Sequence, residues 1–148
     1  MQNNNWYNFK FYNGPVQVAE IAEGVSACSD LHHSGAYSIF LGQVREDTID
    51  RKKVEAIDYT SNEVMAIKSF FQIGCDAKTQ FDIQSLKIIH SLGEVKKGEI
   101  CLMVLVACGH RKESFKACEY IVERLKKEVP VWGREIFSDQ THTWKINK

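Results

Sequence analysis

Basic residues stand at both ends of one predicted helix near the C-terminus. His110 and Arg111 follow Gly109 at its start, and Lys126 lies in its last turn, before Pro130. The first turn of a helix can bind an anion through its free backbone N–H groups and the helix dipole. There Arg111 offers a guanidinium that suits phosphate or carboxylate, and His110 can transfer a proton near neutral pH. The alternative is that His110 only caps the turn and that Arg111 is solvated.

Lys126 could act as a proton donor or a nucleophile if its amine is partly desolvated, because burial lowers the pKa of a lysine. Trp132 supplies an apolar wall nearby, and Arg134 supplies a second cation. The alternative is a surface ion pair between Lys126 and Glu123 or Glu119.

The two basic ends of the helix cannot share a site within one chain by themselves. A helix of about 17 residues is about 25 Å long, so a partner subunit or a folded-back segment would have to join them. Arg45, which ends an earlier strand, is a further candidate, with a solvated side chain as the alternative. His90 ends another strand, where a structural hydrogen bond is expected. A Cys108–His110 nucleophile is disfavoured, because a thiol at the end of an apolar strand is normally packed.

The hydrophobic pattern predicts the elements that position these residues. The unbroken apolar run 100–108 predicts a central strand buried on both faces. Other strands are expected over 35–44, 54–60, 83–90, 132–136 and 143–146. Helices are expected over 16–25, 62–80, capped by Asn62, and 111–128. The inner stripe of the last helix is predicted to be Phe115, Cys118, Val122 and Leu125.

This order of elements predicts an α+β fold, with helices on one face of a mainly antiparallel sheet. The 148 residues are expected to form a single domain. Within it, residues 1–14 are predicted to be a loosely held arm, and residues 46–53 a mobile charged loop.

Composition excludes several classes of protein. The 19 Lys and Arg balance the 19 Asp and Glu, which argues against bulk electrostatic binding to nucleic acid or to a membrane. No apolar run approaches the roughly 18 residues of a membrane span, and the N-terminus does not resemble a signal peptide. A cytoplasmic protein is therefore expected. The five cysteines include no CxxC pair, so neither a zinc site nor a disulfide framework is indicated.

Four motifs together resemble one family. Residues 35–45 (GAYSIFLGQVR) resemble the GAxxxFxGxVR strand of the molybdopterin synthase large (catalytic) subunit. Residues 90–99 resemble its HRxGxxxxGE turn, and His110-Arg111, with Phe115 and Ala117, resembles its helix start. Residues 126–135 (KKEVPVWGRE) resemble its KxxxPxWKxE signature.

The resemblance implies an α/β hammerhead-type fold and a homodimer core of a heterotetramer. A ubiquitin-like small subunit would bind at each end, with its C-terminal Gly-Gly thiocarboxylate in a pocket of the large subunit. Two sulfurs would pass to cyclic pyranopterin monophosphate (precursor Z) to make the dithiolene of molybdopterin. No metal and no organic cofactor is implied, because the sulfur arrives on the partner.

The resemblance also implies the site residues. Lys126 matches the lysine beside the thiocarboxylate tail, and with Arg45 and His110 it is expected to be catalytic. The implied substrate-binding residues are Gln43, Val44, Arg45, His110, Arg111, Lys126, Gly133, Arg134 and Glu135. The family's site includes residues of the neighbouring subunit, which would join the two ends of the last helix.

This sequence departs from the family pattern at three places. Gly133 stands where a second lysine usually follows the tryptophan, and Ser91 stands where the family usually has arginine. Residues 58–65 are a loose version of a further motif. Two alternatives therefore stay open: a catalytically weakened paralogue that only binds the small subunit, and an unrelated phosphate-binding enzyme that uses the helix start at His110 and Arg111.

Overall fold

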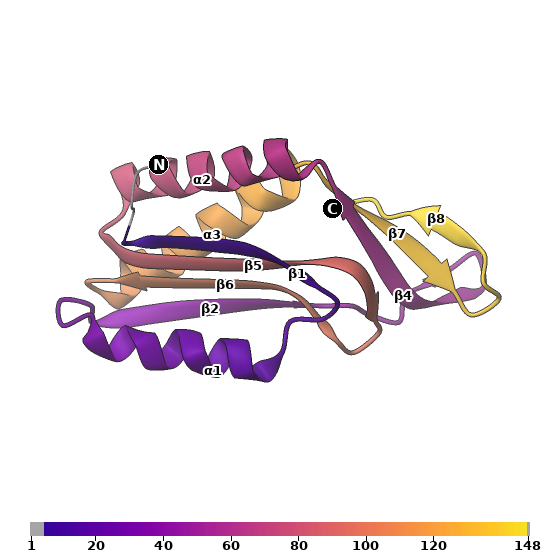
Figure 1. Ribbon diagram of the computed structural model, residues 1–148, viewed down its shortest axis with the longest axis horizontal. Helices are drawn as coiled ribbons and strands as arrows, with labels where there is room; N and C mark the ends of the chain where they lie inside the picture. The colour runs from indigo at the N-terminus through magenta and orange to yellow at the C-terminus, as the bar shows by residue number, and fades with distance from the viewer. Residues whose placement is uncertain (1–4, 148) are drawn as a thin grey trace.

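The computed structural model describes residues 5–147, which form an open, mainly antiparallel sheet packed with helices (Figure 1). The strands run in the order β2-β6-β5-β4-β7-β8, while β1 pairs in parallel with β5, and β3 pairs with β4. The strands are β1 (Tyr7–Asn13), β2 (Ala36–Gln43), β3 (Thr48–Ile49), β4 (Lys52–Ser61), β5 (Ile83–Lys96), β6 (Ile100–Cys108), β7 (Val131–Phe137) and β8 (His142–Trp144). The helices are α1 (Val18–Ala27), α2 (Glu63–Gln80) and α3 (Arg111–Glu128), with a short 3-10 turn, η1 (Cys28–Asp30), after α1. The α+β prediction is confirmed.

β5 joins two parts of the sheet. Up to Leu92 it pairs with β1 and β6, whereas from Gly93 to Lys96 it pairs with β4. Gly93 has a φ of 80°, a left-handed conformation that glycine adopts at little cost. Beyond this bend, β4, β7 and β8 form a ribbon that extends away from the helices (Figure 1). The strand predicted to end at His90 therefore continues, and His90 lies close to the junction of the two parts.

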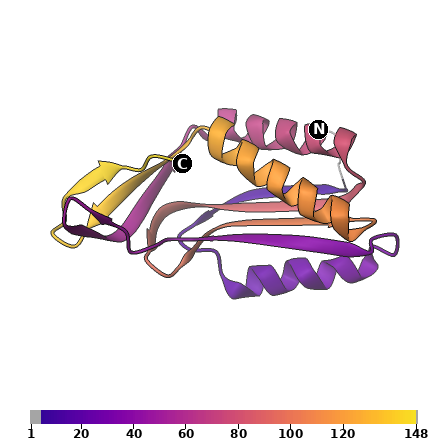
Figure 2. The ribbon, with the colours of Figure 1, turned by 180° about the vertical axis from the view of Figure 1, so that it is seen from behind.

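Apolar residues of β6 are buried on both faces of the sheet, as predicted. Val104 and Val106 belong to the core under α2 and α3, whereas Met103 and Leu105 belong to a second core with residues of α1. α1 therefore covers the face opposite to α2 and α3 (Figures 1 and 2). The prediction of helices on one face is wrong in this respect, because a strand that is apolar on both sides needs cover on both sides.

Two segments predicted to be loose are strands. Residues 7–13 form β1, and Phe9 stacks on Phe70 of α2 with ring centroids 4.2 Å apart. The predicted arm is wrong for this segment, because its alternating aromatic residues pack on the core; residues 1–4 lie outside the described residues. Within 46–53, β3 pairs with the start of β4, so much of the predicted mobile loop is a hairpin.

α3 buries a stripe that shares only Val122 and Leu125 with the predicted one. Its buried residues are Ser114, Ala117, Ile121, Val122 and Leu125. Phe115 is 65% exposed, so its predicted place in the inner stripe is wrong. Small residues face the sheet instead, and the hydroxyls of Ser114 and Ser38 of β2 hydrogen-bond to one another. A bulky side chain at this contact would push α3 away from the sheet.

Candidate functional site

A narrow pocket of about 70 Å³ lies where the last turn of α3 meets β7. The part of the chain between these elements is short because Pro130 ends the helix and β7 begins at the next residue. Its lining combines two lysines and a histidine with apolar and aromatic side chains. The lining residues are Tyr59, Phe70, His90, Leu102, Leu125, Lys126, Val129, Val131, Trp132, Gly133, Lys145 and Asn147.

Lys126 enters this pocket from α3 and is partly buried there. Burial is the main cause that lowers the pKa of its amine, and the positive charge of Lys145 lowers it further. Among the described residues, no carboxylate forms an ion pair with Lys126, so neither Glu123 nor Glu119 neutralises it as the alternative required. The desolvated amine that the sequence analysis required for chemistry is therefore present.

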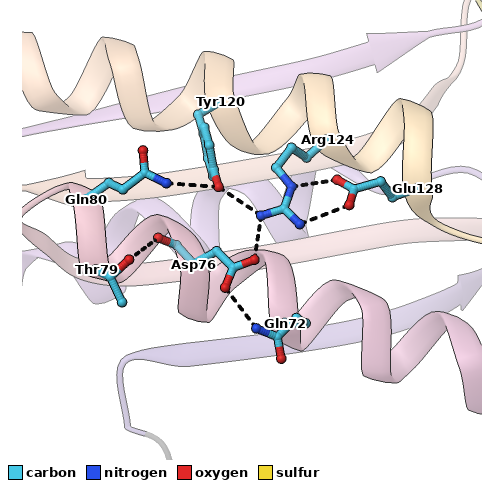
Figure 3. A network of polar contacts seen from close by, with 7 residues as sticks. All are labelled: Gln72, Asp76, Thr79, Gln80, Tyr120, Arg124 and Glu128. Atoms are coloured by element: carbon cyan, nitrogen blue, oxygen red, sulfur yellow. Dashed lines mark hydrogen bonds and ion pairs between the residues drawn. The ribbon is translucent and has the colours of Figure 1, made fainter.

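A polar network fixes the turn of α3 that carries Lys126. The guanidinium of Arg124 lies 2.6 Å from Asp76 of α2, and it also binds Glu128 through two hydrogen bonds of 2.5 and 2.9 Å (Figure 3). The hydroxyl of Tyr120 accepts a further hydrogen bond from Arg124 at 2.8 Å. Because one arginine connects both helices, the end of α3 is held against α2, which fixes the backbone from which Lys126 projects.

His90 forms the inner wall of the narrow pocket and is buried. Its Nδ1 donates to the carbonyl oxygen of Ser91 at 2.8 Å, which leaves Nε2 as the unprotonated nitrogen of the neutral ring. Burial lowers its pKa to about 4, and the charge of Lys126 acts in the same direction. The predicted structural hydrogen bond exists, but the sequence analysis missed that His90 also lines the site.

Gly133 leaves no room for a side chain in the narrow pocket. A Cβ at this position would lie 2.9 Å from Cγ2 of Ile57 and 3.3 Å from Cε1 of Tyr59, both on the paired strand β4. Such a contact is too short for a carbon pair, so any other residue would require Ile57 to move. The absence of the second lysine is therefore matched by the packing around Gly133.

A wider pocket of about 520 Å³ lies on the other side of Lys145. Arg45 lines it with an exposed side chain that pairs with Asp47, with Nε and Oδ1 3.4 Å apart. The carboxylate of Glu135 and the ring of Trp144 also line this pocket. Lys145 belongs to the walls of both pockets, so the Arg45 and Lys126 regions are neighbours.

Three other predicted residues do not line either pocket. Arg134 pairs instead with Asp58 of β4, with Nη2 and Oδ2 3.1 Å apart. Val44 is buried, and its backbone binds Glu99 and Gly98, which fixes the strand end that precedes Arg45. Gln43 is exposed at the end of β2.

His110 and Arg111 lie at the opposite end of α3 from Lys126. Together with Gly35, Gly109 and Lys112 they line a separate hollow of about 410 Å³. The side chain of His110 makes no capping hydrogen bond, so the alternative is wrong for His110, whereas Arg111 is exposed, as the same alternative expected. Within one chain the structure does not bring His110 or Arg111 to Lys126.

Lys145 and Asn147 are two further pocket residues that the sequence did not predict. Lys145 donates its backbone N–H to the carbonyl oxygen of Gly133 at 2.8 Å, and the side chain of Asn147 donates to the carbonyl oxygen of Lys126 at 3.2 Å. These contacts join the C-terminal segment to β7 and α3. No local pattern around Lys145 signals them, since they depend on long-range pairing.

The fold and the site together define the class of this protein. It is an α+β protein with an open sheet, and it has a lysine-lined pocket at the end of a long helix. Within residues 5–147, no group of three or more His, Cys, Asp or Glu side chains is placed to hold a metal ion. No helix in the same range is long and apolar enough to cross a membrane.

Comparisons with known proteins identify the family. The sequence model of the MoaE protein family matches residues 12–128. The molybdopterin synthase catalytic subunit of Emericella nidulans is 40% identical over 139 residues, which cover 90% of this chain and 71% of that protein. The subunit of the same name from Pyrococcus abyssi is 41% identical over 111 residues, covering 75% of this chain and 74% of that protein. The chain therefore belongs to the MoaE protein family.

Solved structures agree with this assignment. The crystal structure of molybdopterin synthase from Staphylococcus aureus matches with a TM-score of 0.78 and 28% identity, and covers 97% of this chain and 99% of that one. The resemblance and the fold predicted from the four motifs are confirmed. The alternative of an unrelated phosphate-binding enzyme is wrong, because the family match extends across the helix start on which that alternative depended.

Proposed function

We propose that this chain is the catalytic subunit of a molybdopterin synthase, which transfers sulfur from a small protein partner to precursor Z. Membership of a family whose curated members carry that name gives the reaction. One observation supports the assignment of roles to particular residues. The partly buried amine of Lys126 lies in a narrow pocket, and a wider pocket lined by Arg45 lies beside it.

The sizes of the two pockets suit two different substrates. The narrow pocket suits the extended Gly-Gly tail of a ubiquitin-like small subunit, whose thiocarboxylate would meet Lys126. The wider pocket has the volume of a small-molecule site, and Arg45 can hold the phosphate of precursor Z through paired hydrogen bonds. Because Lys145 separates the pockets, the sulfur and the pterin would meet next to it.

Lys126 performs two tasks in this proposal. Its ammonium form offsets the negative charge of the thiocarboxylate, and because burial lowers its pKa, it releases a proton more readily than an exposed lysine. His90 stays neutral beside it and does not add a competing positive charge.

The transfer balances without an oxidant or a reductant. Each step breaks the carbon–sulfur bond of one thiocarboxylate and one carbon–oxygen bond of precursor Z, and forms one carbon–sulfur bond in place of the latter. The acyl carbon gains an oxygen from the substrate or from water and leaves as a carboxylate. Two such steps exchange two sulfurs for two oxygens and give the dithiolene.

A second copy of the chain completes the site in this proposal. His110 and Arg111 lie too far along α3 to reach Lys126 of their own chain, as the length of the helix requires. Placed at the site of a partner copy, they would add a proton carrier and a bidentate cation for phosphate. The proposed assembly is therefore a homodimer with a small subunit at each end.

The direct experiment incubates the purified chain with thiocarboxylated small subunit and precursor Z, and measures the dithiolene formed. We expect turnover by the unchanged chain, and a loss of about 10²–10⁴-fold in Lys126→Ala, the usual contribution of an acid–base group. Lys127→Ala is the matched control, because Lys127 is the neighbouring exposed lysine and lines neither pocket. Equal rates for Lys126→Ala and the control would remove Lys126 from the mechanism.

One observation favours a second candidate, a subunit that binds the small partner without turnover. The packing against Gly133 opposes a side chain at the place where the family motif has a lysine, because a Cβ there would lie 2.9 Å from Cγ2 of Ile57. This candidate predicts a stable complex with the small subunit but no dithiolene from the unchanged chain. Turnover in the assay above would exclude it.

A further inference from the structure

The side chain of Lys145 points inward although the chain around it is exposed. Thr143, Trp144 and Ile146 are exposed, whereas Lys145 is partly buried and lines both the narrow and the wider pocket. The hydrogen bond from its backbone N–H to the carbonyl oxygen of Gly133, 2.8 Å long, fixes this position. The C-terminal segment therefore returns to the junction between the helices and the β4-β7-β8 ribbon (Figure 1).

Two amines converge here without a carboxylate bound to either. Among residues 5–147, no ion pair includes Lys126 or Lys145, although the chain forms several elsewhere, such as that of Arg134 with Asp58. The acidic side chains in the lining of these two pockets are those of Asp47 and Glu135, and both line the wider pocket. Like charges in a partly buried site repel, and the charge of Lys145 adds to the larger effect of burial in lowering the pKa of Lys126. An anion between the amines would relieve the repulsion.

β7 does not supply the second cation, because its one arginine, Arg134, pairs with Asp58 and lines neither pocket. Gly133 has no side chain, and the approach of Ile57 leaves no space for one. Lys145 is hydrogen-bonded to that same residue through the backbone, so it brings an ammonium group to the region that Gly133 leaves without charge.

From this arrangement we infer that Lys145 is a substrate-binding residue, which supplies the second positive charge of the site and holds an anionic group between itself and Lys126. The inference rests on the proposed function for the identity of the anion, which is either the thiocarboxylate of the small subunit or the phosphate of precursor Z. Both are oxyanions or their sulfur analogues, and both suit an ammonium group.

Steady-state kinetics of three variants test the inference. Lys145→Met removes the charge and keeps much of the side-chain volume, Lys145→Arg keeps the charge, and Lys127→Met is the control. We expect kcat/KM to fall about 10- to 100-fold in Lys145→Met, the size of a lost charged hydrogen bond. Lys145→Arg should regain most of this loss, and Lys127→Met should match the unchanged chain. Equal kcat/KM for Lys145→Met and Lys127→Met would overturn the inference.

The same kinetics identify the anion. A higher KM for the small subunit in Lys145→Met assigns the thiocarboxylate, and a higher KM for precursor Z assigns the phosphate. A loss in Lys145→Met that Lys145→Arg does not share confirms a role of charge, whereas an equal loss in both shows a structural role and overturns the inference.

A second readout separates this inference from the proposed function. If the unchanged chain produces no dithiolene, the proposed function fails. The pKa of Lys126, measured by pH-dependent acetylation and mass spectrometry, then decides the inference. Removing the charge of Lys145 should raise that pKa in Lys145→Met and leave it unchanged in Lys127→Met. No rise in Lys145→Met would show that the two amines do not share one site.

Discussion

His90 and Lys126 line the same narrow pocket, and the positive charge of Lys126 helps to keep the buried ring of His90 neutral. The ring donates through Nδ1 to the carbonyl oxygen of Ser91 and packs edge-on against Tyr59, with centroids 5.3 Å apart. A neutral imidazole at this position suits a pocket for an anion, because the cationic groups stay confined to the two lysines. The same relationship makes the stability of the fold depend on pH.

Stability should fall as the pH drops below about 6.5. The pKa of His90 is about 4 in the folded chain against 6.5 for the free side chain, so the unfolded state binds more protons between these two values. We expect the free energy of unfolding to decrease by about 2 kcal/mol from pH 7 to pH 5 through this group. Urea unfolding at both pH values measures the change.

The matched variants for this pH effect are His90→Gln and His33→Gln. His90→Gln removes the buried group and should weaken the pH dependence, whatever its effect on stability at pH 7. His33 is exposed, so His33→Gln should keep the dependence of the unchanged chain. A pH dependence that is the same in all three proteins would contradict the assignment to His90.

Gly133 should tolerate no larger residue without a loss of stability. In Gly133→Ala the new methyl group would lie 2.9 Å from Cγ2 of Ile57, and overpacking of this kind costs about 1–3 kcal/mol. Ile57→Leu removes the branch at Cβ and conserves volume, so the double variant should lose less stability than the sum of the single ones. Urea unfolding of the four proteins measures the coupling, and strictly additive losses would show that this contact is not the cause.

The contact between position 133 and Ile57 also affects a lysine introduced at position 133. Gly133→Lys alone carries the strain of the Cβ, so its activity has to be compared with that of the double variant with Ile57→Leu. The position of Lys145 explains how the site can carry two amines without this substitution.

The helix α3 shows what the sequence can and cannot predict. Its bounds, 111–128, follow from the turn before it and from Pro130 after it, and both signals are local. The buried face does not follow, because the predicted and the observed stripe overlap at Val122 and Leu125 and each contains other apolar residues. The choice between Phe115 and Ile121 depends on the close approach of α3 to β2 through Ser114 and Ser38, which no local pattern specifies.

The candidate site also contains some residues that the sequence predicts and others that it does not. The sequence predicts Lys126 as a site residue from its place before Pro130, provided that its amine is partly desolvated. The structure meets this condition, because burial lowers the pKa of the amine. Lys145 and the pocket-lining role of His90 could not, because they depend on the pairing of β8 with β7 and on the extension of β5 past Leu92. Long-range strand pairing, rather than local spacing, assembles this part of the site.

The buried stripe of α3 can be tested directly. Ile121 is fully buried, so Ile121→Ala should lose about 2–5 kcal/mol of unfolding free energy through the transfer of the side chain and the cavity left behind. Phe115 is 65% exposed, so Phe115→Ala should change it by about 0.5 kcal/mol or less. Both measurements use urea unfolding at one pH. A larger loss in Phe115→Ala than in Ile121→Ala would contradict the observed orientation of the helix.

Mixing two inactive variants tests whether the site is shared between copies of the chain. Lys126→Ala and Arg111→Ala should each be weakly active alone. If Lys126 of one copy works with Arg111 of the other, a mixed dimer contains one site with both changes and one site with neither. Random exchange makes half of the dimers mixed, so activity should recover to about a quarter of that of the unchanged protein.

A site built within one chain gives the opposite result. Every chain in the mixture then carries one substitution, so no intact site forms and activity stays at the level of the separate variants. Mixing Lys126→Ala with Lys145→Met is the internal control, because both residues line one pocket of one chain. This pair should not recover in either arrangement. Recovery in the first mixture and not in the second would therefore assign Arg111 to the partner's side of the site and Lys145 to the same side as Lys126.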